Sequence, residues 1–136
     1  MIRTKFVKIL GISEEELISA NADYYSKLSE RTDFDPRDIA AFLSERYRKD
    51  IAALDKVFWE DDKIYQESLF SETREILGKL KDQKTLGIFS QGNEDLQNRK
   101  LDASGLRNYF SPGYIFIMRR KLSDEAIELL PREATF

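Results

Sequence analysis

Apolar side chains in the first half of the chain recur every three or four residues, the spacing of one face of an α-helix. The segment from 13 to 31 opens with Ser13 three residues before Glu16, a capping-box pattern that marks a helix start. Its predicted apolar face consists of Leu17, Ile18, Tyr24, Tyr25 and Leu28. The pattern predicts one amphipathic helix here.

The same spacing continues after this segment. Between 33 and 54, Asp35 can cap a helix and Pro36 suits its first turn, and the pattern allows either a continuation or a break near Asp50. The apolar stripe of this helix is predicted to be Ile39, Phe42, Leu43 and Tyr47. A third helix, capped by Ser71, is predicted to face inward with Ile76, Leu77 and Leu80.

The second half of the chain changes to short, continuous apolar runs. Residues 85–90 are too few for a helix and residues 114–118 are rich in aromatic and β-branched side chains, so both are predicted strands. Helical segments follow each of them, and this α-β-α-β-α order implies parallel strands. We therefore expect an α/β fold, with a helical lobe over residues 1–69 beside part of an α/β core over residues 70–136.

Composition limits the chemistry and the partners of the chain. Its 136 residues carry a net charge of −3, with 22 Lys and Arg interspersed among 25 Asp and Glu, so neither nucleic acid nor an anionic membrane is an expected partner. Cysteine and histidine are both absent, which excludes disulfides, thiolate metal sites and imidazole bases. No apolar stretch approaches the roughly 20 residues of a membrane span. Without a signal-peptide pattern, the expected location is cytoplasmic.

Residues suited to anion binding come directly after the two predicted strands. Ser90 ends the first strand, and the backbone N–H groups of Gln91, Gly92 and Asn93 open a helix whose dipole favours an anion. Lys121, after the second strand, would bring an ammonium to the same anion. Ligands bind beyond the carboxyl ends of parallel strands, so these residues form the predicted phosphate site. Turn formation and helix capping explain the three residues after Ser90 as well.

The segment from 86 to 127 resembles the haloacid dehalogenase (HAD) superfamily, most members of which are magnesium-dependent phosphatases. The resemblance rests on an apolar strand that ends in serine and a small polar turn, on the next helix, and on a lysine after the following strand. The matching helix positions are Gln97, Lys100, Leu101, Gly105, Leu106, Tyr109 and Phe110. Lys121 matches the family lysine but is followed by Leu122 instead of proline, so Arg119 and Arg120 stay alternatives.

This resemblance implies a fold and an activity. The helical lobe would be the family's α-helical cap, and the second half would be part of its Rossmann-like core. As catalytic residues, Ser90 would hydrogen-bond a phosphoryl oxygen of a small phosphorylated substrate and Lys121 would neutralise charge in the transition state. The complete protein would be a Mg²⁺-dependent phosphatase that works through an aspartyl-phosphate.

The family's nucleophile and metal motifs do not stand where the resemblance requires them. Asp33 and Asp35 have Asp-x-Asp spacing but follow a predicted helix, and capping before Pro36 accounts for them. Residues 59–63 are predicted to be a polar turn. We expect the chain to be a fragment that lacks the first and last motifs, with no metal site of its own, weak Mg²⁺ binding and no activity alone.

Two other functions stay open. A HAD-like module without catalysis would bind a phosphate ligand, or a protein through its helical lobe. A flavodoxin-like receiver domain also has a hydroxyl and a lysine at neighbouring strand ends, but the helical first half and the helix that begins at Asn93 favour the HAD resemblance. The sequence predicts neither the substrate nor the oligomeric state.

Overall fold

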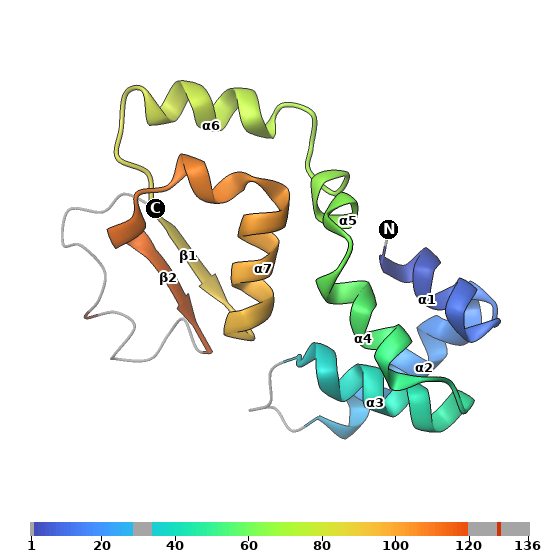
Figure 1. The fold of residues 1–136 in the computed structure, drawn as a ribbon. Helices are drawn as coiled ribbons and strands as arrows, with labels where there is room; N and C mark the ends of the chain where they lie inside the picture. The colour runs from blue at the N-terminus through green and yellow to red at the C-terminus, as the bar shows by residue number, and fades with distance from the viewer. Residues whose placement is uncertain (1, 29–33, 120–127, 129–136) are drawn as a thin grey trace.

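The computed structural model describes residues 2–28, 34–119 and 128, which form a helix-rich α/β structure. In chain order the elements are α1 (Ile2–Leu10), α2 (Glu14–Lys27), α3 (Pro36–Tyr47), α4 (Ile51–Trp59), α5 (Asp62–Gln66), α6 (Thr73–Lys81), β1 (Ile88–Gln91), α7 (Glu94–Ser104), the 3₁₀ helices η1 (Leu106–Tyr109) and η2 (Pro112–Tyr114), and β2 (Ile115–Met118). Helices α1 to α4 gather on one side, and α5 leads to the side that holds α6, α7 and the strands (Figure 1).

Local caps start most of the helices where the sequence predicts. Ser13 caps α2, and Asp35 caps α3 with Pro36 in its first turn. Asp50 caps α4, so the chain breaks there into two helices. The predicted cap at Ser71 is wrong, because α6 has Glu72 at its N-cap position with no side-chain hydrogen bond. A capping side chain contributes about 1 kcal/mol, so α6 lacks a stabilising contribution that α2, α3 and α4 have.

The buried core lies mainly on the helical side. Leu17, Leu43 and Leu54 are almost completely enclosed, and the rings of Phe6 and Phe58 pack with centroids 5.4 Å apart. The core cluster comprises Phe6, Leu10, Leu17, Ala20, Tyr24, Ile39, Ala40, Leu43, Leu54, Val57, Phe58, Ile64 and Leu96. Since nearly all of these residues come from α1 to α5, these helices enclose a core of their own.

Two of the predicted apolar faces are partly wrong. In α2, Ile18 and Tyr25 are 49% and 51% exposed, because the buried stripe passes through Leu17 and the positions one and two turns further on. In α6 no side chain is buried, and Ile76 and Leu80 are 54% and 42% exposed. Helix α6 lies against little more than η1, so its apolar face has no second element that would bury it.

Strands β1 and β2 are adjacent and parallel, as predicted. Ile88 lies opposite Ile115, and Gln91 lies opposite Met118. Both strands are shorter than expected, because the chain before β1 is irregular and η2 precedes β2. Among the described residues each strand has one neighbour, and apart from Gln91 their side chains are half-buried. The structure thus establishes a helix-rich α/β arrangement with a small parallel sheet.

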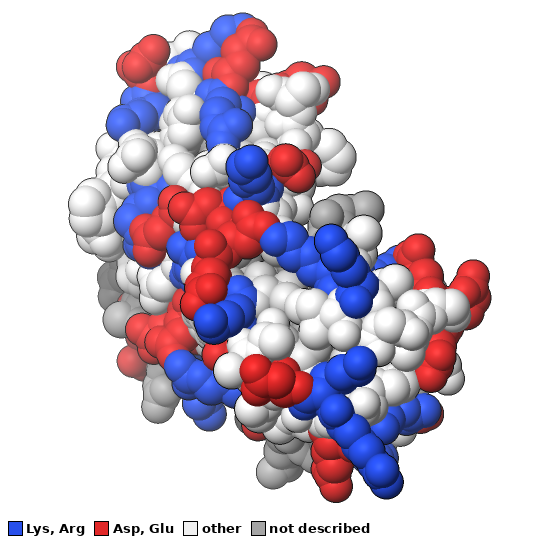
Figure 2. Space-filling view, turned by 45° about the vertical axis from the view of Figure 1, so that its right-hand side comes forward, with Lys and Arg blue, Asp and Glu red and all other residues white. Residues whose placement is uncertain are grey.

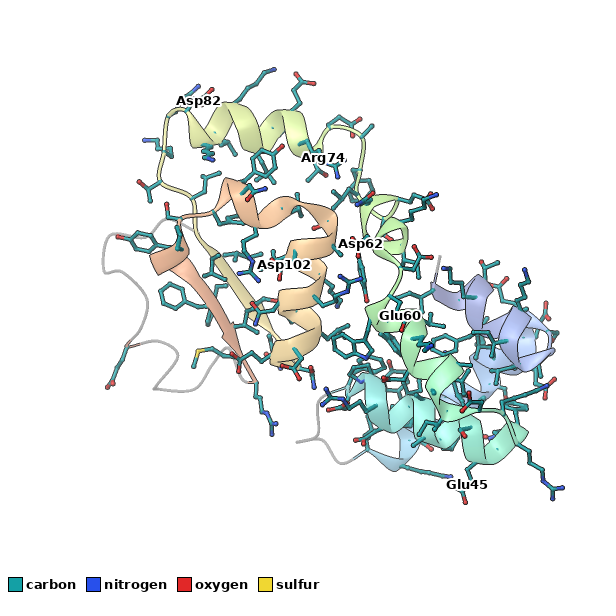
Figure 3. The ribbon with its side chains drawn as sticks, in the orientation of Figure 1. Glu45, Glu60, Asp62, Arg74, Asp82 and Asp102 are labelled. Carbon is teal, nitrogen blue, oxygen red and sulfur yellow. The ribbon has the colours of Figure 1, made fainter. Side chains whose placement is uncertain are left out.

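The two sides meet along α5 and α7. The side chains of Gln66 and Arg74 donate hydrogen bonds of 3.1 and 2.9 Å to carbonyls in the last turn of α7. Arg99 of α7 pairs with Asp62 of α5. Figure 3 shows Asp62 between α5 and α7, and Arg74 above the carboxyl end of α7. Both donors satisfy carbonyls that a helix end leaves open. Gln66 thereby joins α7 to α5, whereas Arg74 joins α7 to α6 on its own side of the molecule.

Charges of both signs are intermixed over the molecular face in Figure 2. Several belong to exposed ion pairs, such as Arg3 with Glu14 at 2.9 Å and Lys79 with Glu75 at 2.6 Å. Exposed pairs of this kind stabilise a fold by about 1 kcal/mol or less. Among the described residues, no helix combines the length and the apolar character that crossing a membrane requires.

Candidate functional site

Ser90 and the carboxyl end of β2 lie at the same edge of the sheet. Ser90 pairs with Ile117, and beyond β1 the Gly92 N–H donates to the Met118 carbonyl at 3.0 Å. The hydrogen bonding therefore extends one residue past the end of β1 and holds the turn after Ser90 beside the last residue of β2. This edge is where a ligand binds in an open parallel sheet.

Three residues that the sequence offers as candidates for the anion site or for the nucleophile motif lie outside the described residues. They are Lys121, its alternative Arg120, and Asp33. Arg119 follows β2 directly and is exposed. A role for Lys121 beside Ser90 therefore stays a prediction.

The turn between β1 and α7 has a specific need for glycine. Gly92 has φ of +138°, and a Cβ at this position would lie 2.8 Å from Nε2 of Gln97. That same Nε2 donates to the carbonyl of Gln91 at 2.8 Å. Gln97 therefore holds the turn closed. Gln97 is one of the positions that match the HAD pattern, but the pattern does not indicate this hydrogen bond. A side chain at Gly92 would displace it.

The start of α7 combines favourable and unfavourable features for an anion. Asn93 caps the helix, its Oδ1 accepting from the Leu96 N–H at 3.0 Å. The Gly92 N–H is already bonded to β2, and the first turn carries the carboxylates of Glu94 and Asp95. Like charges oppose an anion here, so the helix dipole alone is a weak attraction and a cation is needed.

Asn93 also connects the two sides of the molecule. Its Nδ2 donates to Oδ2 of Asp35 at 2.9 Å, while Oδ1 of Asp35 accepts from the Arg37 N–H at 2.8 Å. The Arg37 guanidinium lies 3.5 Å from the Asp95 carboxylate and over the ring of Trp59. Both oxygens of Asp35 are thus engaged, and the capping interpretation of this aspartate is confirmed.

On one face of β1, Ser90 lines a cavity of about 640 Å³ between α1, α5, β1 and α7. One face of α7 supplies Gln97, Lys100, Leu101 and Ser104, which follow helical spacing. Most of the remaining wall is apolar, with Ile2, Ile64, Leu69, Ile88 and Leu106. Lys100 of α7 and Ser90 of β1 therefore line the same cavity.

Lys100 is a site residue that the sequence analysis does not assign. Neither its ammonium nor the Ser90 hydroxyl has a hydrogen-bond or ion-pair partner among the residues that the structure describes. Burial lowers the pKa of Lys100 below its ordinary value. The sequence signal is its place in the helix pattern that resembles the HAD family, but that pattern does not say that the ammonium faces a cavity.

A second groove, of about 880 Å³, runs along β2 and η1. Of the three cations that line it among the described residues, two are already engaged. Lys81 donates to the Asn108 carbonyl at 2.6 Å, and Arg107 bonds Asn98 Oδ1 at 2.7 Å and pairs with Asp102. The third cation, Lys84, is exposed, and the carboxylate of Glu94 also lines this groove. The groove therefore suits an anion less well than the cavity with Lys100.

The two aspartates between α4 and the first turn of α5 have structural partners. Asp61 caps α5 and pairs with Lys5, and Asp62 pairs with Arg99. The segment from 59 to 63 is thus partly the turn that the sequence predicts. Within residues 2–28, 34–119 and 128, no three acidic side chains converge into a group that would hold a metal ion.

Comparisons with known proteins do not assign this site. No family model matches the chain, and no curated protein or solved structure does so either. Its function is therefore argued from its own residues.

Proposed function

We propose that the chain is the phosphate-binding part of a HAD-like, Mg²⁺-dependent phosphatase and that it binds a small phosphorylated molecule beside Ser90. The parallel pairing of β1 and β2 carries this proposal. That pairing puts the serine hydroxyl and the chain that leaves Met118 at one edge of the sheet. Residues from two neighbouring strands thereby reach one ligand, which is the usual arrangement in open α/β sheets.

The charges around this edge give Lys121 a defined role in the proposal. A phosphate dianion would accept a hydrogen bond from Ser90 but would meet the carboxylates of Glu94 and Asp95 at the start of α7. A cation must offset this repulsion, and Lys121 follows the last residue of β2 by three positions. A charge-assisted hydrogen bond from its ammonium would supply roughly 1.5–3 kcal/mol.

Catalysis by this chain alone is not part of the proposal. Among the described residues, the Ser90 hydroxyl has no hydrogen-bonded base, and a serine without one is a weak nucleophile at neutral pH. Asp35 uses both carboxylate oxygens for backbone and side-chain hydrogen bonds. The aspartyl-phosphate chemistry of the family would need a carboxylate other than Asp35.

Titration of the ¹⁵N-labelled chain with inorganic phosphate tests the binding site. We expect weak binding with amide shifts centred on Ser90 to Asn93, and Lys121→Ala should weaken it about tenfold or more. Arg120→Ala is the matched control and should have a smaller effect. Equal losses in the two variants would mean diffuse attraction to a basic surface and would contradict the proposal.

An assay with p-nitrophenyl phosphate and Mg²⁺ tests the catalytic part. We expect the purified chain to show no Mg²⁺-dependent turnover typical of the family. Turnover that disappears in Asp33→Asn would show instead that the Asp33 and Asp35 pair is the nucleophile motif. Phosphate binding without turnover would also fit the non-catalytic HAD-like alternative.

A further inference from the structure

The cavity between α1, α5, β1 and α7 has the size and the lining of a small-molecule binding pocket. Its volume of about 640 Å³ lies within the range of small-molecule pockets. Ile64 and Leu69 come from α5 and the residues after it, Ile88 from β1, and Leu101 from α7, so four apolar side chains from three parts of the chain line it. An apolar ligand body would find matching surface on several sides.

Charge in this cavity is unbalanced. Arg3 and Glu14 also line it, and they neutralise each other in an ion pair of 2.9 Å. Gln97 uses its amide nitrogen to close the turn after β1. Lys100 is therefore the one charged side chain of the cavity lining without a partner of opposite charge among the described residues.

An unpaired ammonium in a mostly apolar wall is costly for folding. Water solvates it incompletely, and burial lowers the pKa of Lys100. The chain nevertheless has lysine here, in a cavity that Ser90 also lines. An anion in the cavity would satisfy both groups at once, because the ammonium and the hydroxyl are both donors.

We propose that this cavity binds an organic anion with an apolar body, its anionic head between Lys100 and Ser90 and its body against Ile64, Leu69 and Leu101. Charge complementarity selects the head, and the apolar lining selects the body. The proposal shares Ser90 with the phosphate site but does not depend on it, since a carboxylate head serves as well as a phosphate.

Calorimetric titration of the full chain with octanoate and with octyl phosphate tests this inference. We expect both to bind, and Lys100→Met should weaken each about tenfold or more, because methionine keeps the length of the side chain without its charge. Lys100→Arg should restore most of the affinity. Lys63→Met, at an exposed lysine of α5 outside the cavity, is the matched control and should change nothing.

Two further probes separate the contributions of the head and the body: octanol has no charge, and inorganic phosphate has no apolar body. Octanol should bind more weakly than octanoate and should not respond to Lys100→Met, and inorganic phosphate should bind more weakly than octyl phosphate. Equal losses in Lys63→Met and Lys100→Met would overturn the inference, provided that circular dichroism shows both variants folded. Failure of octanoate to bind, while inorganic phosphate still responds to Lys121→Ala, would overturn it and leave the phosphate proposal standing.

Discussion

The helical side and the α/β side of the molecule differ in how they bury apolar surface. Leu17, Leu43 and Leu54 are enclosed by neighbouring helices, whereas Phe70 and Ile76 are 84% and 54% exposed. Neither strand has a fully buried side chain, although parallel strands are usually covered on both faces. The helical side is thus stabilised by a core of its own.

The α/β side depends on its connections to the helices. Helix α7 packs against α5, and the side chain of Gln66 in α5 donates to a carbonyl in the last turn of α7. At its other end Asn93 bonds Asp35. Two strands alone are marginally stable in water. The sheet therefore depends on α7, which connects it to the helical core.

Substitutions in the helical core should reduce stability more than any others proposed here. Leu43→Ala should lower the free energy of unfolding by about 2–5 kcal/mol, because it leaves a cavity among enclosed side chains. Ile117→Ala in β2, where the side chain is half-buried, should cost about 1 kcal/mol. Urea denaturation measures both. Equal losses would show that the sheet is as well packed as the helices.

A double-mutant cycle tests the link between the two sides. Asp35→Asn still caps α3 but turns an NH₂ group toward that of Asn93, and Asn93→Asp still caps α7 but opposes two carboxylates. Each single variant should lose about 1 kcal/mol of stability, and the double variant should recover most of it because donor and acceptor have exchanged places. Strictly additive losses in chemical denaturation would argue against the link.

Lys100 should lower the stability of the unliganded protein. Its pKa is lowered in the folded state, so at neutral pH the folded state holds a poorly solvated charge that the unfolded state exposes to water. Lys100→Met should raise the thermal midpoint slightly at pH 7. Between the lowered pKa and the ordinary lysine value the unfolded chain binds more protons, so wild-type stability rises with pH and the advantage of the variant shrinks. Thermal melts at pH 7 and pH 10 measure this, and Lys63→Met should show no such trend.

Substitutions on α6 should change the free energy of unfolding least. Ile76→Ser should change the free energy of unfolding by no more than about 0.5 kcal/mol, since the side chain is more than half exposed. Ile39→Ser on α3 places a hydroxyl in the core and should cost several times as much. A loss of similar size at both positions would mean that α6 is covered in solution.

Local signals in the sequence determined where most elements begin. Ser13, Asp35 and Asp50 cap their helices through contacts that span only two or three residues, so no distant part of the chain is needed to predict them. The alternation of strands and helices likewise predicted two parallel strands, because a helix between strands implies a crossover.

The burial of each face and the pairing of distant polar groups depend on how the elements pack, which local sequence signals do not specify. Ile76 and Ile39 each belong to an apolar stripe with helical spacing. Ile76 is exposed and Ile39 is buried, because burial depends on which element lies opposite the stripe. The hydrogen bond between Asp35 and Asn93 joins residues 58 positions apart, and the cavity that holds Ser90 and Lys100 exists only where α7 packs beside β1. Periodicity identifies an apolar or charged stripe along one element, but the partner of that stripe is set by packing between segments distant in the chain.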